Sequence, residues 1–201
     1  DVMEIFNSNK AYLSQRFSGI SAEAQSFTSL EFEDCRFEDC NFTDAQFLRC
    51  SFIECDFVRC NFSLANFAQS RFLEVKFVDS KLLGVDWTKA LWPKNVFVQA
   101  LRFERCKLND SSFFGLQLDE LVLDECIVKD VDFRNGSFNR AKFCYSDFEN
   151  SIFQRTSLKE ADFSEATNYN VDIFQNDISK ARFSRFEAIS LLNSLDIELV
   201  D

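Results

Sequence analysis

Eight cysteines are the side chains of this 201-residue sequence that could most readily do chemistry, because thiolates bind metal ions, form disulfides and act as nucleophiles. The sequence has no histidine, which excludes Cys-His and Ser-His dyads and metal sites with imidazole ligands. Within two groups, seven cysteines are spaced by five residues or a multiple of five, unlike the CxxC spacing of zinc sites: Cys35, Cys40, Cys50, Cys55, Cys60, Cys106 and Cys126. The pattern therefore gives little support to a metal site.

Paired carboxylates and phosphate-binding loops are the other candidates for catalytic chemistry. Adjacent acids such as Glu33 and Asp34 fall on positions that we expect to face solvent. The four glycines are scattered, so no glycine-rich phosphate loop is present. We expect no catalytic residue, no cofactor, no metal and no small-molecule substrate, and we expect that the protein is not an enzyme.

A phenylalanine at every fifth residue, from Phe27 to Phe77, is the pattern that must position all other residues. Neither an α-helix nor a strand brings residues five apart onto one face, so the period indicates a repeat protein. With one six-residue step before Phe103, the register continues to Phe183. We expect these large residues to form a core spine that includes Phe32, Phe37, Phe42, Phe47, Phe52, Phe57, Phe62, Phe133, Phe138, Phe143, Phe148 and Phe153.

Each large residue of this register is the centre of one five-residue repeat, and a small residue stands two positions before most centres. Neither the column of centres nor the column of small residues contains a charged residue. There are 32 centres between Phe27 and Phe183, and 27% of the chain is charged. Chance would place about seventeen charged residues in the two columns together. Two columns of each repeat are therefore expected to point inward and three outward.

This pattern resembles the pentapeptide repeat family, whose usual unit A(D/N)Lxx is seen in pieces such as Ala161-Asp162-Phe163 and Cys40-Asn41-Phe42. The resemblance implies an all-β fold, a right-handed quadrilateral parallel β-helix with four pentapeptides per turn. Glycine is scarce, and we therefore expect a corner turn that suits ordinary L-residues.

The seven regularly spaced cysteines occupy the small inward column, where a free thiol behaves as a small buried hydrophobe. With twenty residues per turn, Cys35 stacks over Cys55, roughly 4.8 Å away. That separation is within disulfide range, but parallel side chains do not provide the required dihedral angle without strain. We favour reduced core thiols over an oxidised pair, and a metal site comes last. Cys144, on an outward column, is the expected exception.

The sequence divides into four segments. Residues 1–16 lack the repeat and are expected to cap the first turn. Residues 17–97 and 98–185 form two blocks of one solenoid, separated by an interruption near residues 89–102. Pro93 belongs in a bulge, helical turn or protruding loop there, either as a tolerated irregularity or as a recognition loop. Asn168 is the one polar centre, and we expect the coil to bend at it.

Residues 186–201 break the period. The segment from Glu187 to Leu195 reads as a short amphipathic α-helix, with Ser184 and Glu187 forming a capping box, and the last six residues alternate as a half-buried strand does. This end is more apolar than a monomer's cap needs, so we expect a homodimer through Phe186, Ile189, Leu192, Leu195, Ile197 and Leu199.

The net charge of −11 disfavours direct nucleic-acid binding, since such binding depends on lysine and arginine, and we expect none. A basic protein partner fits better. No apolar run approaches the roughly 20 residues of a membrane helix, so we expect a soluble cytoplasmic protein. The acidic residues that we consider for partner contact are Glu187, Asp196, Glu198, Asp201, Glu31, Glu33 and Asp34.

Segments outside the repeat resemble the albicidin-resistance branch of the family, and the quinolone-resistance and microcin-immunity branches are more distant. These segments include 83–88, 90–93, 103–106, 168–174 and 191–199. The resemblance implies a C-terminal dimer that mimics DNA, binds DNA gyrase or topoisomerase IV, and protects the enzyme from a topoisomerase poison, giving resistance or self-immunity. The alternative is a pentapeptide-repeat scaffold with an unrelated protein partner.

Overall fold

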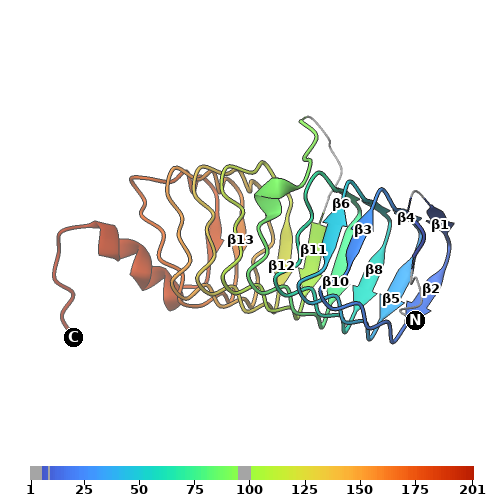
Figure 1. Cartoon of the computed structure of the whole chain (residues 1–201). Coiled ribbons are helices and arrows are strands. Elements are labelled where there is room, and N and C mark those ends of the chain that lie inside the picture. The colour runs from blue at the N-terminus through green and yellow to red at the C-terminus, as the bar shows by residue number, and fades with distance from the viewer. Residues whose placement is uncertain (1–5, 9, 95–100) are drawn as a thin grey trace.

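The computed structural model describes residues 6–8, 10–94 and 101–201 and shows a parallel β-solenoid of about eight turns (Figure 1). Each strand pairs in parallel with a strand one turn later, as Phe32 does with Phe52. Because most partners lie twenty residues apart, one turn contains four pentapeptides. The expected right-handed quadrilateral parallel β-helix is confirmed.

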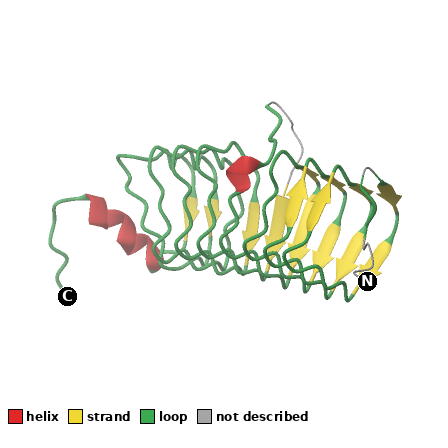
Figure 2. Ribbon diagram, viewed as in Figure 1, coloured by secondary structure: helices red, strands yellow, loops and turns green. Residues whose placement is uncertain are grey.

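Two faces of the solenoid carry most of the strands (Figure 2). The four-stranded face contains β1 (Ala11–Leu13), β4 (Glu31–Glu33), β7 (Ser51–Ile53) and β9 (Arg71–Leu73). The six-stranded face contains β2 (Arg16–Ser18), β5 (Arg36–Glu38), β8 (Asp56–Val58), β10 (Val75–Val78), β11 (Leu101–Glu104) and β12 (Val122–Asp124). Two further pairs are β3 (Ser26–Thr28) with β6 (Gln46–Leu48) and β13 (Asp162–Phe163) with β14 (Arg182–Phe183).

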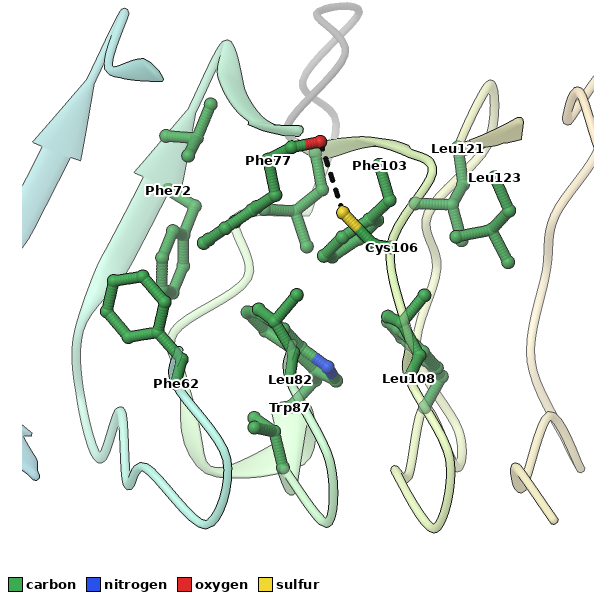
Figure 3. Close-up of a cluster of buried hydrophobic side chains, with 14 of the residues drawn as sticks. Phe62, Phe72, Phe77, Leu82, Trp87, Phe103, Cys106, Leu108, Leu121 and Leu123 are labelled. Atoms are coloured by element: carbon green, nitrogen blue, oxygen red, sulfur yellow. Dashed lines mark hydrogen bonds between the residues drawn. The ribbon is translucent and has the colours of Figure 1, made fainter. Parts of the chain in front are cut away.

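Aromatic rings fill the interior in stacked columns. The rings of Phe37 and Phe57 are stacked with centroids 4.7 Å apart, whereas Phe32 and Phe37, on adjacent faces, meet edge to face at 5.2 Å. Both arrangements are favoured by the ring quadrupole. All twelve spine residues named from the sequence are buried. Figure 3 shows how the column passes from Phe77 to Phe103 across the interruption.

The N-terminal end is closed by Phe6. Its side chain is buried, and its ring meets those of Tyr12, Phe17, Phe27 and Phe32 edge to face. β1 and β2 already pair with the following turn, so strands of the solenoid begin inside the segment that we expected to be a cap. Among the described residues, the covering role belongs to Phe6.

Hydroxyls and thiols of the small inward column also link neighbouring turns. The Cys50 amide donates to Ser70 Oγ at 2.9 Å, and Ser70 Oγ donates to the Phe47 carbonyl at 2.8 Å. Cys106 Sγ contacts the Phe77 carbonyl in the same way, at 3.4 Å (Figure 3). These groups satisfy backbone atoms that would otherwise be buried without a partner. The sequence pattern had indicated only that the side chains of this column are small.

The corners correct our expectation about turn type. At regular five-residue intervals the corner residue has a positive φ, near 52° to 56° at residues such as Ala24, Asp34 and Arg49, none of which is glycine. This left-handed region costs an L-residue on the order of 1 kcal/mol. Backbone hydrogen bonds between turns, such as that from the Asp34 amide to the Ile53 carbonyl at 3.0 Å, hold the corner residues in this conformation.

The interruption takes up six extra residues, because Phe77 pairs with Phe103 rather than with a residue twenty positions later. Trp87 is buried and begins a short 3-10 helix, η1 (Trp87–Lys89), and Trp92 is half-buried with its ring stacked on Phe72. Pro93 follows η1 in a segment without regular secondary structure, and it is exposed. Both tryptophans are therefore core residues as expected, whereas residues 95–100 lie outside the described part of the chain.

Asn168 marks a local bend, as expected from its polar side chain at a centre position. It is exposed, has a φ of 57°, and donates through Nδ2 to Asp147 Oδ1 at 2.9 Å. The next residue, Tyr169, is buried in its place. Shifting the chain by one residue thus keeps a ring in the core and the amide in solvent.

Candidate interaction surfaces

The C-terminal helix, η2 (Glu187–Ser194), projects obliquely from the last turn (Figure 1). The expected helix is present, although it is of the 3-10 type rather than α. The expected capping box is wrong, because the Glu165 amide donates to the Ser184 hydroxyl, which in turn donates to the Glu165 carboxylate. The expected strand after Leu195 is also wrong, since these residues have no regular structure and are exposed.

Three side chains fix η2 to the solenoid. Leu191 is half-buried against the core, and Ser190 Oγ donates to the Tyr169 carbonyl at 3.2 Å. The Ile173 amide donates to Ser194 Oγ at 3.3 Å. The helix therefore covers backbone groups at the end of the last turn. Sequence reasoning missed Leu191, which lies between the apolar positions that we had assigned to one face.

The residues that we expected at a dimer interface form an exposed apolar edge of this segment. Phe186 is 82% exposed and Ile189 is 51% exposed. The segment also exposes Leu192, Ile197 and Leu199, whereas Leu195 is half-buried. Exposed apolar side chains gathered in this number are typical of an interaction surface.

The acidic residues of the tail lie beside this apolar edge. Asp196, Glu198 and Asp201 are exposed, whereas Glu187 is half-buried. Burial, followed by the nearby Glu187 carboxylate, raises the pKa of Tyr169 to about 12. Tyr169 is therefore neutral at pH 7.

The second acidic group lies near the other end of the solenoid. Glu31 and Glu33 are the ends of β4, Asp34 follows at the corner, and all three are exposed. The structure therefore does not bring the two groups of acidic candidates together. They are separated by most of the length of the solenoid.

The six-stranded face is different, because charges on its strands and at its adjoining corners are paired between turns. Lys76 Nζ on β10 lies 3.3 Å from Glu104 Oε2 on β11, and at the corners Arg59 Nε lies 2.7 Å from Asp39 Oδ1. Hydrogen bonding from Arg59 holds the pKa of the Asp39 carboxyl below its usual range. Surface pairs of this kind stabilise little but cancel the local field. This face has no excess of unpaired negative charge to offer a basic partner.

The cysteines are free thiols, and seven of the eight are buried. Burial raises the pKa of Cys55 to about 12, whereas a hydrogen bond with Cys60 lowers the pKa of Cys40 to about 7. Cys40 is only 3% exposed, so access limits its reactivity. The described residues contain no group of three or more Cys, Asp or Glu arranged for a metal ion.

The repeat and the square solenoid lead directly to a family. The model of the pentapeptide repeat region matches residues 25–99 and 85–163 of this sequence. The chain belongs to the pentapeptide repeat family. No curated protein sequence matches the chain.

Solved structures share the fold over nearly the whole length. A trypsin-treated variant of QnrB1, a plasmid-mediated fluoroquinolone resistance protein, superposes with a TM-score of 0.70 at 16% identity, covering 95% of this chain and 99% of that one. HetL, which is involved in heterocyst differentiation regulation in the cyanobacterium Nostoc sp. strain PCC 7120, superposes with a TM-score of 0.59 at 13% identity, covering 87% and 85%. In the described part of the chain, no helix is long and apolar enough to cross a membrane.

Proposed function

We propose that this pentapeptide repeat protein binds bacterial DNA gyrase, or topoisomerase IV, in place of DNA and protects the enzyme from an albicidin-like or quinolone-like poison. The protein acts as a homodimer joined through η2 and the tail, and no catalysis is involved. Because gyrase works on the chromosome, the proposal places the protein in the cytoplasm. Its consequence for the cell is resistance or self-immunity.

The observation that carries the proposal is a straight rod with a net charge of −11 and, at both ends, carboxylates that form no ion pair with another described residue. Eight turns at roughly 4.8 Å give a rod of about 40 Å, so two rods joined end to end span about 80 Å. Duplex DNA is likewise a stiff acidic rod. The dimer would place both acidic tails, each with four carboxylates, at its centre, where a two-fold enzyme surface would meet them.

The test combines gyrase, a poison and the purified dimer. We expect the dimer to reduce poison-induced DNA cleavage and to alter gyrase supercoiling in a concentration-dependent way. Duplex DNA should compete for binding, and rising salt should weaken it, because exposed charges are screened over roughly 10 Å at 0.1 M salt. An intact dimer without effect on cleavage at any ratio to gyrase would favour the alternative, a scaffold for an unrelated protein.

A further inference from the structure

The four-stranded face carries an apolar column that is interrupted by one carboxylate. The strand register places Leu13, Glu33, Ile53 and Leu73 in one line along the rod. Leu13 is 64% exposed, and Ile53 and Leu73 are half-buried. The four-stranded face thus keeps apolar side chains accessible to a partner.

The surface of this face is hollowed at its N-terminal end. A cavity of about 380 Å³ is lined by β1, by β4 and by Ser51 and Ile53 of β7. Glu31 and Glu33 stand on the same side of β4, since side chains two positions apart in a strand point the same way, at a separation of roughly 7 Å. Apolar walls from Leu13 and Ile53 flank Glu33 on the two neighbouring turns.

No basic side chain of the described residues forms an ion pair with Glu31, Glu33 or Asp34. Asp34 is oriented by Ser14, whose hydroxyl donates to Oδ2 at 2.6 Å. Lys10 Nζ lies over the Tyr12 ring, 5.1 Å from its centroid, rather than against a carboxylate. The hollow therefore combines negative charge with apolar walls, and no basic side chain of the described residues lies within ion-pair distance of its carboxylates.

We propose that this hollow binds an arginine side chain carried by an extended basic segment of a partner protein. The guanidinium has a planar fork of donors that suits the two carboxylates of Glu31 and Glu33, and its methylene stem would contact Leu13 and Ile53. A lysine has only a compact ammonium group and would bind less well. The inference does not depend on gyrase as the partner, because it concerns the side chain that the surface recognises.

The probe is a capped pentapeptide, Gly-Val-Arg-Val-Gly, titrated into the isotopically labelled full-length protein and followed by NMR. We expect saturable shifts of the amide signals of Leu13, Glu31, Glu33 and Ile53. The analogue with citrulline in place of arginine keeps the shape but loses the charge, and we expect no saturable shift with it. The lysine analogue should bind at least about threefold more weakly. Equal binding of the arginine and citrulline peptides would overturn the proposal.

Matched variants separate this site from general attraction to an acidic protein. Glu31→Gln combined with Glu33→Gln should weaken the arginine peptide about tenfold, whereas Asp110→Asn with Asp130→Asn removes two exposed charges elsewhere and should change little.

The apolar wall is tested by Leu13→Ser, with Leu64→Ser, at a residue 60% exposed on another face, as its control. Leu13→Ser should weaken the peptide at least about threefold. The proposal is rejected if either pair of variants behaves alike, or if the peptide shifts signals all over the protein. Melting curves confirm that each variant is folded. Because the peptide assay contains no gyrase, its outcome is independent of the gyrase proposal.

Discussion

Single side chains of the small inward column do more than fill space. The Ser70 hydroxyl accepts from the Cys50 amide and donates to the Phe47 carbonyl, so it joins two neighbouring turns of the chain through two hydrogen bonds. A thiol in this column can make the same contacts at longer range, as Cys126 Sγ does when it accepts from the Cys106 amide at 3.4 Å. Serine and cysteine are therefore interchangeable here because both side chains accept a hydrogen bond from a backbone amide of the neighbouring turn.

Ser70→Ala tests this role. It leaves the buried Cys50 amide without its partner, and we expect it to lower the free energy of unfolding by about 1–3 kcal/mol. Ser70→Cys retains a weak acceptor and should cost clearly less. Urea denaturation of the two variants and the wild type measures the difference. Equal losses of unfolding free energy for the alanine and cysteine variants would show that the hydrogen bond of residue 70 does not contribute to stability.

The left-handed corners lead to a second prediction at this scale. Ala24 has a φ of 56° and an exposed methyl group, so Ala24→Gly relieves the strain of an L-residue and should stabilise the protein by about 0.5–1 kcal/mol. Ala45, which is fully buried in the small inward column, serves as the control. Ala45→Gly should destabilise by about 1 kcal/mol, since it removes a core methyl and adds backbone freedom. Thermal melts that rank the two variants in the opposite order would contradict the corner geometry.

Cys144 should be the first thiol to react in the native protein, because it alone is not fully buried. Its partial burial, followed by the neighbouring Asp162 carboxylate, raises the pKa of this thiol to about 11. The reactive thiolate is therefore scarce below the pKa, and the rate of alkylation at pH 8 should be roughly a hundredfold below that of an unperturbed thiol. The rate should rise about tenfold per pH unit and level off near pH 11. Cys144→Ser should abolish this phase, and a rate independent of pH between 7 and 9 would be inconsistent with the raised pKa.

At the scale of elements, η2 and the preceding Phe186 form a segment whose two sides have different roles. Leu191, Ser190 and Ser194 attach it to the last turn, whereas Phe186 and Ile189 point away from the protein. Deleting the whole segment would therefore disturb both the end of the solenoid and any interface. Substitutions on the exposed side separate the two effects.

Phe186→Ser combined with Ile189→Ser should convert the proposed dimer into a monomer with little change in the melting temperature of the monomeric unit, because neither side chain is part of the core. Sedimentation velocity measures the oligomeric state. Leu64→Ser, which removes an exposed apolar side chain from a corner of the solenoid, should leave the dimer intact. Deletion of residues 186–201 should also give a monomer, or an aggregating chain with an exposed apolar end. If the double variant still sediments as a dimer, the interface lies elsewhere.

For the whole molecule, the distribution of unpaired charge matters more than its sum. The six-stranded face neutralises itself through pairs such as Lys76 with Glu104, while the tail and the N-terminal end of the four-stranded face keep their carboxylates free of ion pairs among the described residues. In the proposed dimer, the two tails meet at the centre and the two Glu31 regions lie at the distant ends. A partner would thus encounter three separated acidic regions.

Charge reversal tests which region dominates in binding gyrase. Asp196→Lys with Glu198→Lys should weaken binding at least about tenfold, because four charges are reversed at the centre of the dimer. Asp119→Lys with Glu120→Lys should have a smaller effect, since these two carboxylates lie near Arg140 on the wall of the solenoid, at 4.0 Å and 3.3 Å. Binding is measured at several salt concentrations, after sedimentation has shown that both variants are dimers. An equal loss in both would show that only total charge counts.

The sequence alone determined the inward columns, because a period of five and the absence of charge at positions such as Phe32 and Cys35 are visible without coordinates. It also indicated the family, the bend at Asn168 and the C-terminal helix. Only the tertiary structure decided which atoms meet between turns: that Ser70 bridges two backbone groups, that Leu191 rather than Leu192 faces the core, and that Glu33 lies between two apolar side chains. The physical reason is distance along the chain. Each of these contacts depends on what a turn about twenty residues away presents, and a local pattern does not contain that information.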